Sequence, residues 1–410
     1  MPKYTFDKWS DIYANRVKTL RSSAVRDLMS VADMPEVISF AGGFPDVKDF
    51  PAGRILKTTT HLMENSKATA LQYASSHGDE ALRKIIVELL ESEKIYVDTD
   101  DMMITFGAQQ GLDLLAKIFL NPGDIVLAES PTYLGALNAF ITYQAQVVQI
   151  KMDKNGLIPK ELEKTLKGLK KKPKFLYTVP SFQNPSGITL SETRRKSLVK
   201  IAKKYDLLII EDNAYSALRF EGDPLPTLRS LDENIIFLGT FSKIFFIPGA
   251  RLGWLVAPRA IMEKLLFAKQ AADLCCGSLP QKLTEHYLTN YDWRKYAQKM
   301  IKKYTKKRDV MLAALKEHFP KEAKWTYPSG GFYIWVTLPE FLDTTEMLAE
   351  AVNEQKVAFV PGEGFYYREG GKNKMRLSYC LPSEKEIKEG IKRLAKVVKR
   401  NMEIYRSLER

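Results

Sequence analysis

Apolar runs and amphipathic stretches alternate through the middle of the chain. The runs 207–210 (LLII) and 235–238 (IIFL) are apolar at every position, which is typical of strands buried on both faces of a parallel sheet. Seven such strands are predicted at Met102–Phe106, Ile125–Glu129, Val147–Ile150, Lys174–Val179, Leu207–Asp212, Ile235–Thr240 and Leu252–Ala257. Apolar residues at helical spacing predict helices at 79–92, 134–143, 159–168 and 191–204. The alternation predicts an α/β fold with a mostly parallel seven-stranded sheet between layers of helices.

The two ends of the chain follow other patterns. Near the N-terminus, helical spacing joins Val17, Leu20, Ala24, Leu28 and Val31. Towards the C-terminus the pattern predicts helices at 293–318, 343–353 and 384–400, and strands at Phe332–Val336, Val357–Val360 and Met375–Tyr379. We therefore expect an N-terminal arm over 1–50, a large domain over 51–300 and a smaller α+β domain over 301–410.

The composition is that of an ordinary globular protein. Of the 410 residues, 45% are hydrophobic and 27% are charged, enough to bury large cores. The apolar runs are too short for a transmembrane helix, and charges near the N-terminus argue against a signal peptide. We therefore expect a cytoplasmic protein with no membrane partner. The three cysteines lack C-x-x-C spacing, so neither a disulfide framework nor a metal site is expected.

The net charge of +13 is spread along the chain. The densest run, Lys167–Lys174, is interpreted as a helix end that enters a loop, and such runs are usually solvated faces. No Arg-rich or aromatic-interleaved tract accompanies it, so no nucleic-acid partner is expected. A positive excess does favour anionic substrates and cofactors.

Polar residues gather where the predicted strands end. Ser130–Tyr133, Pro180–Gly187, Asp212–Tyr215 and Ser242–Lys243 each follow a different strand. Ligands bind beyond the carboxyl ends of parallel strands, so we expect these segments to converge on one site. The turn at Gly107–Ala108 lies between a strand and a helix N-terminus, a geometry that aims backbone N–H groups at a phosphate. Its sequence is neither a P-loop nor a dinucleotide fingerprint.

A lysine and a carboxylate carry the chemistry that this edge suggests. Lys243 follows Thr240 and Ser242 and precedes an apolar run and Arg251. A lysine reacts covalently only when its pKa is depressed, and the hydroxyls and Arg251 would hold an anion beside it. Taken alone, Lys243 also fits a solvated surface lysine. Asp212 ends an apolar strand, where a carboxylate needs a cationic partner such as a protonated ring nitrogen, or serves as a helix cap.

Three further polar residues have two interpretations each. Tyr133 could stack on a cofactor ring, and Asn184 and Tyr215 could bind a phenolic oxygen. The alternatives are that both tyrosines belong to the core and that Asn184 is the turn residue of N-P-S-G. The convergence of such residues at one sheet edge favours the functional interpretation.

The chain resembles the class I/II aminotransferases of pyridoxal-phosphate fold type I, and within them the 2-aminoadipate/kynurenine aminotransferase-like branch. The resemblance runs almost end to end in matching order and spacing. It rests on SAVRDLM (23–29), ISFAGGFPD (38–46), LQY (71–73), FGAQQGLDL (106–114), ESPTYLGALNAF (129–140), VPSFQNPSG (179–187), EDNAY (211–215), TFSKIFFIPGARLGW (240–254), AKQAADL (268–274), PSGGFYIWV (328–336), VAFVPGEGF (357–365) and MRLSYC (375–380).

The resemblance implies roles for these positions around pyridoxal 5′-phosphate. Lys243 would bind the cofactor covalently and move the substrate's Cα proton, Asp212 would bond the ring nitrogen, and Tyr133 would stack on the ring. Asn184 and Tyr215 would contact its phenolate oxygen. The phosphate ligands would be Gly107, Ala108, Gln109, Thr240, Ser242 and Arg251, with Tyr73 from a neighbouring subunit of a homodimer. The substrate contacts would be Arg376 for the α-carboxylate, Gly42 and Gly43 beside the substrate, Asn184, and Arg26 for an acidic side chain.

The implied reaction is a ping-pong transfer of an amino group from an L-amino acid to a 2-oxo acid such as 2-oxoglutarate. Expected donors are 2-aminoadipate, glutamate or aromatic amino acids, with broad specificity as a further option. A lyase or decarboxylase with the same cofactor would use nearly the same residues. The branch also resembles the effector domains of winged-helix transcription regulators, but about 36 residues precede the motifs here, too few for a winged helix.

Overall fold

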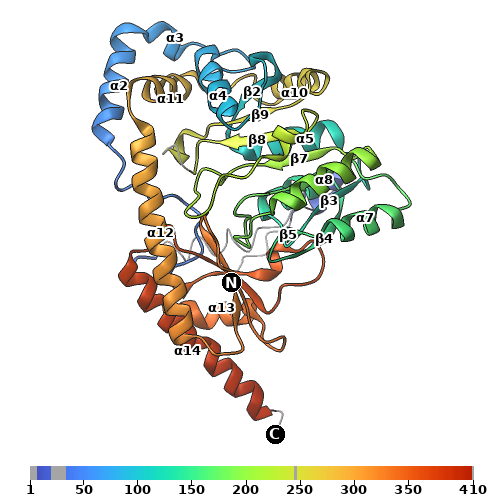
Figure 1. Cartoon of the computed structure of the whole chain (residues 1–410), viewed down its shortest axis with the longest axis vertical. Coiled ribbons are helices and arrows are strands. Elements are labelled where there is room, and N and C mark those ends of the chain that lie inside the picture. The colour runs from blue at the N-terminus through green and yellow to red at the C-terminus, as the bar shows by residue number, and fades with distance from the viewer. Residues whose placement is uncertain (1–6, 20–33, 244–246, 409–410) are drawn as a thin grey trace.

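The computed structural model describes residues 7–19, 34–243 and 247–408 (Figure 1). Most of the amphipathic segment predicted near the N-terminus lies outside these residues, and only the 3-10 turn η1 (Asn15–Thr19) precedes the gap. In the described part of the chain, no helix is both long and apolar enough to cross a membrane.

The larger sheet lies in the upper half of the molecule as drawn in Figure 1. Its strand order is β2-β9-β8-β7-β6-β3-β4-β5. The strands are β2 (Met102–Thr105), β3 (Ile125–Ser130), β4 (Gln146–Asp153), β5 (Gly156–Leu157), β6 (Phe175–Thr178), β7 (Ile209–Asp212), β8 (Ile236–Thr240) and β9 (Gly253–Val256). The neighbours from β8 through β4 pair in parallel, whereas β9 is antiparallel to both β8 and β2.

The seven predicted strands are all present, and the mostly parallel character of the sheet is confirmed. The predicted number is one too small, because the two-residue strand β5 pairs antiparallel with the end of β4. A strand of two residues is too short to carry a hydrophobic period, so no sequence pattern marks it.

Helices cover both faces of this sheet because its strands are apolar on both. In β6, Phe175 and Tyr177 pack against Phe140 of α6, whereas Leu176 lies in a separate cluster with Leu198 of α8. The helices of this part are α2 (Ala52–Asn65), α3 (Lys67–Leu71), α4 (Glu80–Ser92), α5 (Gly107–Phe119), α6 (Leu134–Thr142), α7 (Pro159–Gly168), α8 (Glu192–Tyr205), α9 (Leu228–Leu231), α10 (Arg259–Ala272) and α11 (Ser278–Asn290). The short turns are η2 (Thr99–Asp101) and η3 (Pro248–Ala250).

A second, antiparallel sheet lies at the other end of the long helix α12 (Trp293–His318), which runs past both parts (Figure 1). Its order is β10-β11-β14-β13. The elements are β10 (Lys324–Trp325), β11 (Tyr333–Thr337), α13 (Thr344–Asn353), β13 (Val360–Pro361), η4 (Gly362–Phe365), β14 (Lys374–Ser378) and α14 (Glu384–Leu408). The α+β character of this region is as expected, and α14 runs eight residues beyond the predicted end at 400.

The strand predicted at Val357–Val360 is divided in two. Its first half, β12 (Val357–Ala358), pairs in parallel with β1 (Ile38–Ser39), and β13 pairs with β14. The chain changes sheets at the buried Phe359. This pairing brings the segment that follows β1 against the second sheet, where it forms one wall of the site.

Candidate active site

A cavity of about 500 Å³ lies at the carboxyl ends of the central strands and is closed by the second sheet. It brings together fourteen of the sixteen residues predicted for the site. They are Gly42, Gly43, Gly107, Ala108, Gln109, Tyr133, Asn184, Asp212, Tyr215, Thr240, Ser242, Lys243, Arg251 and Arg376. The expected convergence of the strand ends on one cavity is therefore confirmed.

A larger hollow of about 770 Å³ lies at the opposite ends of the same strands. Its lysines pair with aspartates: Lys171 and Lys174 share Asp124, Lys172 pairs with Asp206, and Lys203 with Asp232. With most of its positive charge compensated, this hollow offers no comparable set of reactive groups among the described residues. The chemistry belongs to the cavity at the carboxyl ends.

Asp212 ends β7 and is 5% exposed. Its Oδ2 accepts a hydrogen bond of 2.7 Å from the hydroxyl of Tyr177. Its Oδ1 is buried and has no hydrogen-bond partner among the described residues. Burial raises the pKa of the Asp212 carboxyl to about 6, although the Tyr177 hydrogen bond and the nearby Lys243 oppose the shift. A buried, half-satisfied carboxylate favours a cationic N–H ligand.

Lys243 follows the end of β8, and its Nζ donates a hydrogen bond of 3.0 Å to the carbonyl oxygen of Gly43. Burial, together with the positive charges of Arg376 and Arg251, lowers the pKa of Lys243 to about 8, although Cys380 and Asp212 oppose the shift. At that pKa about one amine in ten is neutral at pH 7. The solvated-lysine alternative is therefore wrong. The apolar run that follows lies partly outside the described residues.

The N-terminus of α5 opens onto the cavity beside the hydroxyls of Thr240 and Ser242. Within the described chain no side chain caps this helix at Phe106, so its first N–H groups are available to an anion. Gly107 has a φ of +70°, and a Cβ there would lie 2.8 Å from Nη2 of Arg251. Glycine thus gives both the turn and the room for the guanidinium.

The start of α5 is held by a polar cluster around the buried Lys269, which the sequence did not reveal. Oε1 of Gln110 accepts from the backbone N–H of Phe106 (2.9 Å) and from Nζ of Lys269 (3.1 Å). Lys269 is fully buried, and Asp273 compensates its charge at 2.9 Å. This arrangement orients the first turn of α5 without occupying the N–H groups that face the cavity.

Arg376 on β14 supplies the cationic end of the cavity. Its Nη1 donates to Oδ1 of Asn184 (2.9 Å) and its Nη2 to the carbonyl oxygen of Ala41 (2.7 Å). The guanidinium lies 4.4 Å from the ring centroid of Tyr333, a cation–π distance. Its Nε has no partner within the described chain. Asn184 thus has a second role beyond a turn residue, because its amide orients the arginine.

Two tyrosines from different strand ends line the cavity. Burial raises the pKa of Tyr133 to about 12, so its phenol stays protonated near neutral pH. The hydroxyls of Tyr215 and Tyr333 lie 3.3 Å apart. The half-buried Tyr133 and the buried Tyr215 therefore both line the cavity. The structure adds Tyr177 and Tyr333 to the site. Both lie within strands, whereas Tyr133 and Tyr215 were predicted from their places after strand ends.

Two predicted residues are not in the cavity. Tyr73 is 79% exposed on the described chain, and its contact with another subunit stays a prediction. Arg26 lies outside the described residues. A metal site was not expected, and the described residues contain no group of metal-ligating side chains.

The cavity fits a phosphorylated pyridine aldehyde. The free Oδ1 of Asp212 suits a protonated ring nitrogen, and the partly neutral amine of Lys243 suits a carbonyl carbon. The open end of α5, with two hydroxyls and Arg251, suits a phosphate. These three donor sets occupy different walls of one cavity, as a single ligand of that kind requires.

Comparison with protein families agrees with this geometry. The model of the family "Aminotransferase class I and II" matches residues 35–394. The chain belongs to this family. The aminotransferase is 42% identical to aromatic-amino-acid aminotransferase 1 of Thermococcus litoralis, over 98% of this chain and 96% of that protein.

Solved structures extend the likeness. Kynurenine aminotransferase of Pyrococcus horikoshii, solved with PMP, shares 42% identity with this aminotransferase and a TM-score of 0.91, over 96% of this chain and 98% of that one. The α-aminoadipate aminotransferase of Thermus thermophilus, complexed with N-(5′-phosphopyridoxyl)-L-leucine, shares 33% identity and a TM-score of 0.90, over 97% and 100%. The fold is therefore that of fold type I, and the cofactor of this aminotransferase is pyridoxal 5′-phosphate.

Proposed function

We propose that the aminotransferase accepts acidic and aromatic L-amino acids, 2-aminoadipate and glutamate among them, and passes their amino groups to 2-oxoglutarate by a ping-pong mechanism. The names of its relatives, which include an aromatic-amino-acid, a kynurenine and an α-aminoadipate aminotransferase, support this range. The aromatic Phe44 and Tyr333 in the cavity walls support the aromatic part of this range.

The observation that carries the proposal is that Arg376 and Lys243 both hydrogen-bond to one segment of the cavity wall, Phe40–Pro45. Arg376 bonds the carbonyl of Ala41, and Lys243 bonds the carbonyl of Gly43, two residues further along the same segment. A planar guanidinium binds a carboxylate through two parallel hydrogen bonds. A substrate carboxylate at Arg376 would thus place its Cα within reach of the Lys243 amine.

The other cavity residues have supporting roles in this proposal. Asp212 holds the ring nitrogen, Tyr133 stacks on the ring, and Asn184 and Tyr215 contact its phenolic oxygen. The phosphate would be held by Gly107, Ala108, Gln109, Thr240, Ser242 and Arg251. When bound, the cofactor supplies an electron sink for the bond broken at Cα. Neutral Lys243 Nζ then accepts the Cα proton and returns it, as a general base and acid.

The proposal includes the oligomeric state of the enzyme. We infer a homodimer in which Tyr73 reaches the phosphate site of the partner subunit, which agrees with its exposure. A cytoplasmic location, contact of Arg26 with an acidic substrate side chain, and the division of the chain at 50 and 300 remain predictions.

A panel of L-amino acids with 2-oxoglutarate tests the substrate proposal. Purified enzyme loaded with cofactor is mixed with each donor, the cofactor absorbance is followed, and the products are identified by mass spectrometry. We expect 2-aminoadipate, glutamate and aromatic donors to react faster than alanine. Equal rates for all donors would contradict the proposed preference. Release of pyruvate and ammonia without an acceptor would instead indicate a lyase.

Hybrid dimers test the composite site. In a dimer of one Tyr73→Phe chain and one Lys243→Ala chain, one site combines the intact lysine with the partner's intact tyrosine. We expect Tyr73→Phe alone to weaken cofactor binding by about tenfold, the size of one hydrogen bond to a charged group. The hybrid should regain wild-type affinity at one site. A monomer by light scattering, or no recovery in the hybrid, would refute the shared site.

A further inference from the structure

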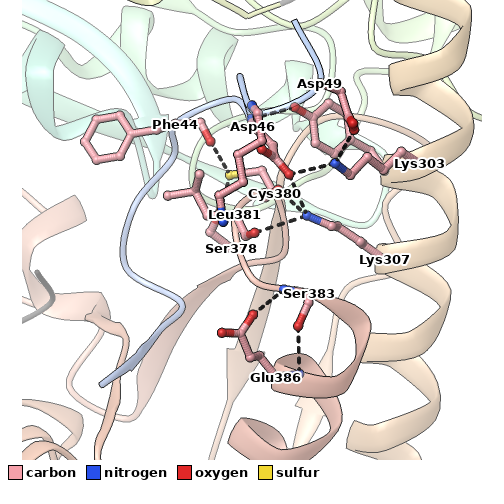
Figure 2. A network of polar contacts seen from close by, with 12 residues as sticks. Phe44, Asp46, Asp49, Lys303, Lys307, Ser378, Cys380, Leu381, Ser383 and Glu386 are labelled. Atoms are coloured by element: carbon pink, nitrogen blue, oxygen red, sulfur yellow. Dashed lines mark hydrogen bonds and ion pairs between the residues drawn. The ribbon is translucent and has the colours of Figure 1, made fainter. Parts of the chain in front are cut away.

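The cavity wall that touches both Lys243 and Arg376 is held in place by a buried ion-pair network (Figure 2). The wall is the segment Phe40–Pro45, which has no helix and only follows the two-residue strand β1. The carbonyl oxygens of Ala41 and Gly43 point to Arg376 and Lys243. A segment without its own secondary structure depends on outside contacts for its position.

The first anchor is Asp46, directly after this wall. Its Oδ2 accepts from Nζ of Lys303 at 2.8 Å and lies 3.5 Å from Nζ of Lys307, both on α12. Its backbone N–H donates to the hydroxyl of Tyr304 on the same helix at 2.9 Å. Burial opposes ionisation of Asp46, but the hydrogen bonds from Lys303 and from the N–H of Lys48 hold its pKa below the usual value. The carboxylate is therefore charged where it meets α12.

The second anchor is the ammonium of Lys307, which is only 4% exposed. Besides Asp46, it donates to the carbonyl oxygens of Cys380 (2.8 Å) and Leu381 (3.2 Å), just after the strand β14 that carries Arg376. The thiol of Cys380 in turn donates to the carbonyl of Phe44 in the wall. Figure 2 shows Asp46, Cys380 and Leu381 around the ammonium of Lys307, and Phe44 of the wall beside Cys380.

We propose that Asp46 and Lys307 are positioning residues for the substrate carboxylate, because they fix the wall that orients Arg376 relative to Lys243. The inference rests on the proposed role of Arg376. Neither residue lines the cavity, so both act through the wall. Their loss should weaken the binding of every ligand that carries the carboxylate. Cofactor affinity should stay unchanged, since the phosphate would be held on another wall by α5 and the end of β8.

Two probes separate this role from a general loss of stability. 3-Phenylpropanoate carries the carboxylate of phenylalanine without its amine, and 2-phenylethylamine carries the amine without the carboxylate. In Asp46→Asn holoenzyme, we expect the Kd of 3-phenylpropanoate to rise about tenfold, the loss expected when one charge-assisted hydrogen bond is misaligned. The Kd of 2-phenylethylamine and of the cofactor should change less than about twofold.

Asp49→Asn is the matched control, because Asp49 also pairs with Lys303 (2.7 Å) but is exposed and does not contact Lys307. Asp49→Asn should leave the Kd of both probes unchanged. Asp46→Asn leaves the buried ammonium of Lys307 without its carboxylate and should lower Tm. The double variant Asp46→Asn/Lys307→Met removes that charge, so Tm should recover while carboxylate binding stays weak.

The outcomes distinguish this inference from the proposed function. Arg376→Lys must raise the Kd of 3-phenylpropanoate; if it does not, the assignment of the carboxylate site is wrong. If Arg376→Lys does weaken it but Asp46→Asn does not, only the positioning role fails. If the double variant recovers carboxylate affinity together with Tm, the network is merely structural and the inference is overturned.

Discussion

The hydroxyl of Tyr177 donates a 2.7 Å hydrogen bond to one carboxylate oxygen of Asp212, and the other oxygen has no partner among the described residues. Both side chains are buried in the middle of the sheet. Tyr177 therefore fixes one oxygen of the carboxylate and leaves the other free for the ring nitrogen that we propose it binds. The relationship explains how a buried acid can be held ready for a cationic ligand.

Tyr177→Phe should lower kcat/KM between about tenfold and a hundredfold, the range for one hydrogen bond to a charged group. Burial raises the pKa of Asp212 and the tyrosine hydroxyl opposes that rise. Without the hydroxyl the pKa rises further, so the acid limb of the pH–rate profile should move to higher pH. Tyr143→Phe is the control, because Tyr143 makes a similar bond to Asp113 elsewhere. An unshifted profile would show that Tyr177 does not tune Asp212.

Lys243→Ala should lose at least about 10³-fold in the half-reaction with any amino donor, since it removes the general base and the covalent attachment of the cofactor. Stopped-flow absorbance measures that loss. Cofactor should still bind through its phosphate, which equilibrium dialysis checks. Turnover at the wild-type rate would refute the assignment of the active site.

Gly43→Ala should raise the KM of amino donors about tenfold or more, matching the roughly 1–3 kcal/mol that overpacking costs. A Cβ at Gly43 would clash with the hydroxyl oxygen of Tyr333, a buried ring beneath Arg376. Either the wall or the ring must move. Gly53→Ala is the matched control, because no described atom beyond its chain neighbours and its own helix backbone comes within 4 Å of its Cβ position. Equal KM values for the two variants would contradict a tightly packed wall.

Lys269→Met should weaken the binding of pyridoxal 5′-phosphate but not that of pyridoxal, because the lysine orients the first turn of α5 through Gln110. A loss of about tenfold in cofactor affinity corresponds to one such hydrogen bond. Tryptophan fluorescence titration with each ligand measures it. The exposed Lys264→Met on the same helix serves as the comparison. Equal losses for both ligands would mean that the whole cavity is disturbed.

Glu93→Gln should stabilise the protein at high pH. Burial, together with the nearby Glu211, raises the pKa of Glu93 to about 7. A carboxyl whose pKa is raised in the folded state stabilises it fully below the unfolded value near 4.5, and this contribution is lost as pH rises through 7. The difference in Tm between variant and wild type should therefore grow from pH 5 to pH 8. Since Glu93 is partly exposed, we expect on the order of 1 kcal/mol, or about 1 °C for a chain of this length.

The same series with the exposed Glu91→Gln provides the baseline for this pH dependence. Because Glu91 lies two residues away, in the last turn of α4, it matches the change in net charge. A pH-independent Tm difference for Glu93→Gln would show that its carboxyl titrates normally.

The sequence alone determined the sheet, its seven longer strands and most of the cavity. Apolar runs mark buried strands, and parallel strands bring their carboxyl ends to one edge. Lys243 and Asp212 could therefore be assigned from their places after β8 and at the end of β7. The family motifs extended this to Arg376, which lies within a strand where no local rule marks it.

Only the tertiary structure decided which groups support these residues. Tyr177 and Asp212 are 35 positions apart, and Lys307 and Asp46 are 261 apart. Hydrophobic periodicity reports which face of an element is buried, but it does not report which side chain of a distant element lies opposite. The hydrogen bond that opposes the effect of burial on the pKa of Asp212 and the ion pair next to the segment Phe40–Pro45 arise from packing across the sheet and along α12. They therefore follow from the folded chain alone.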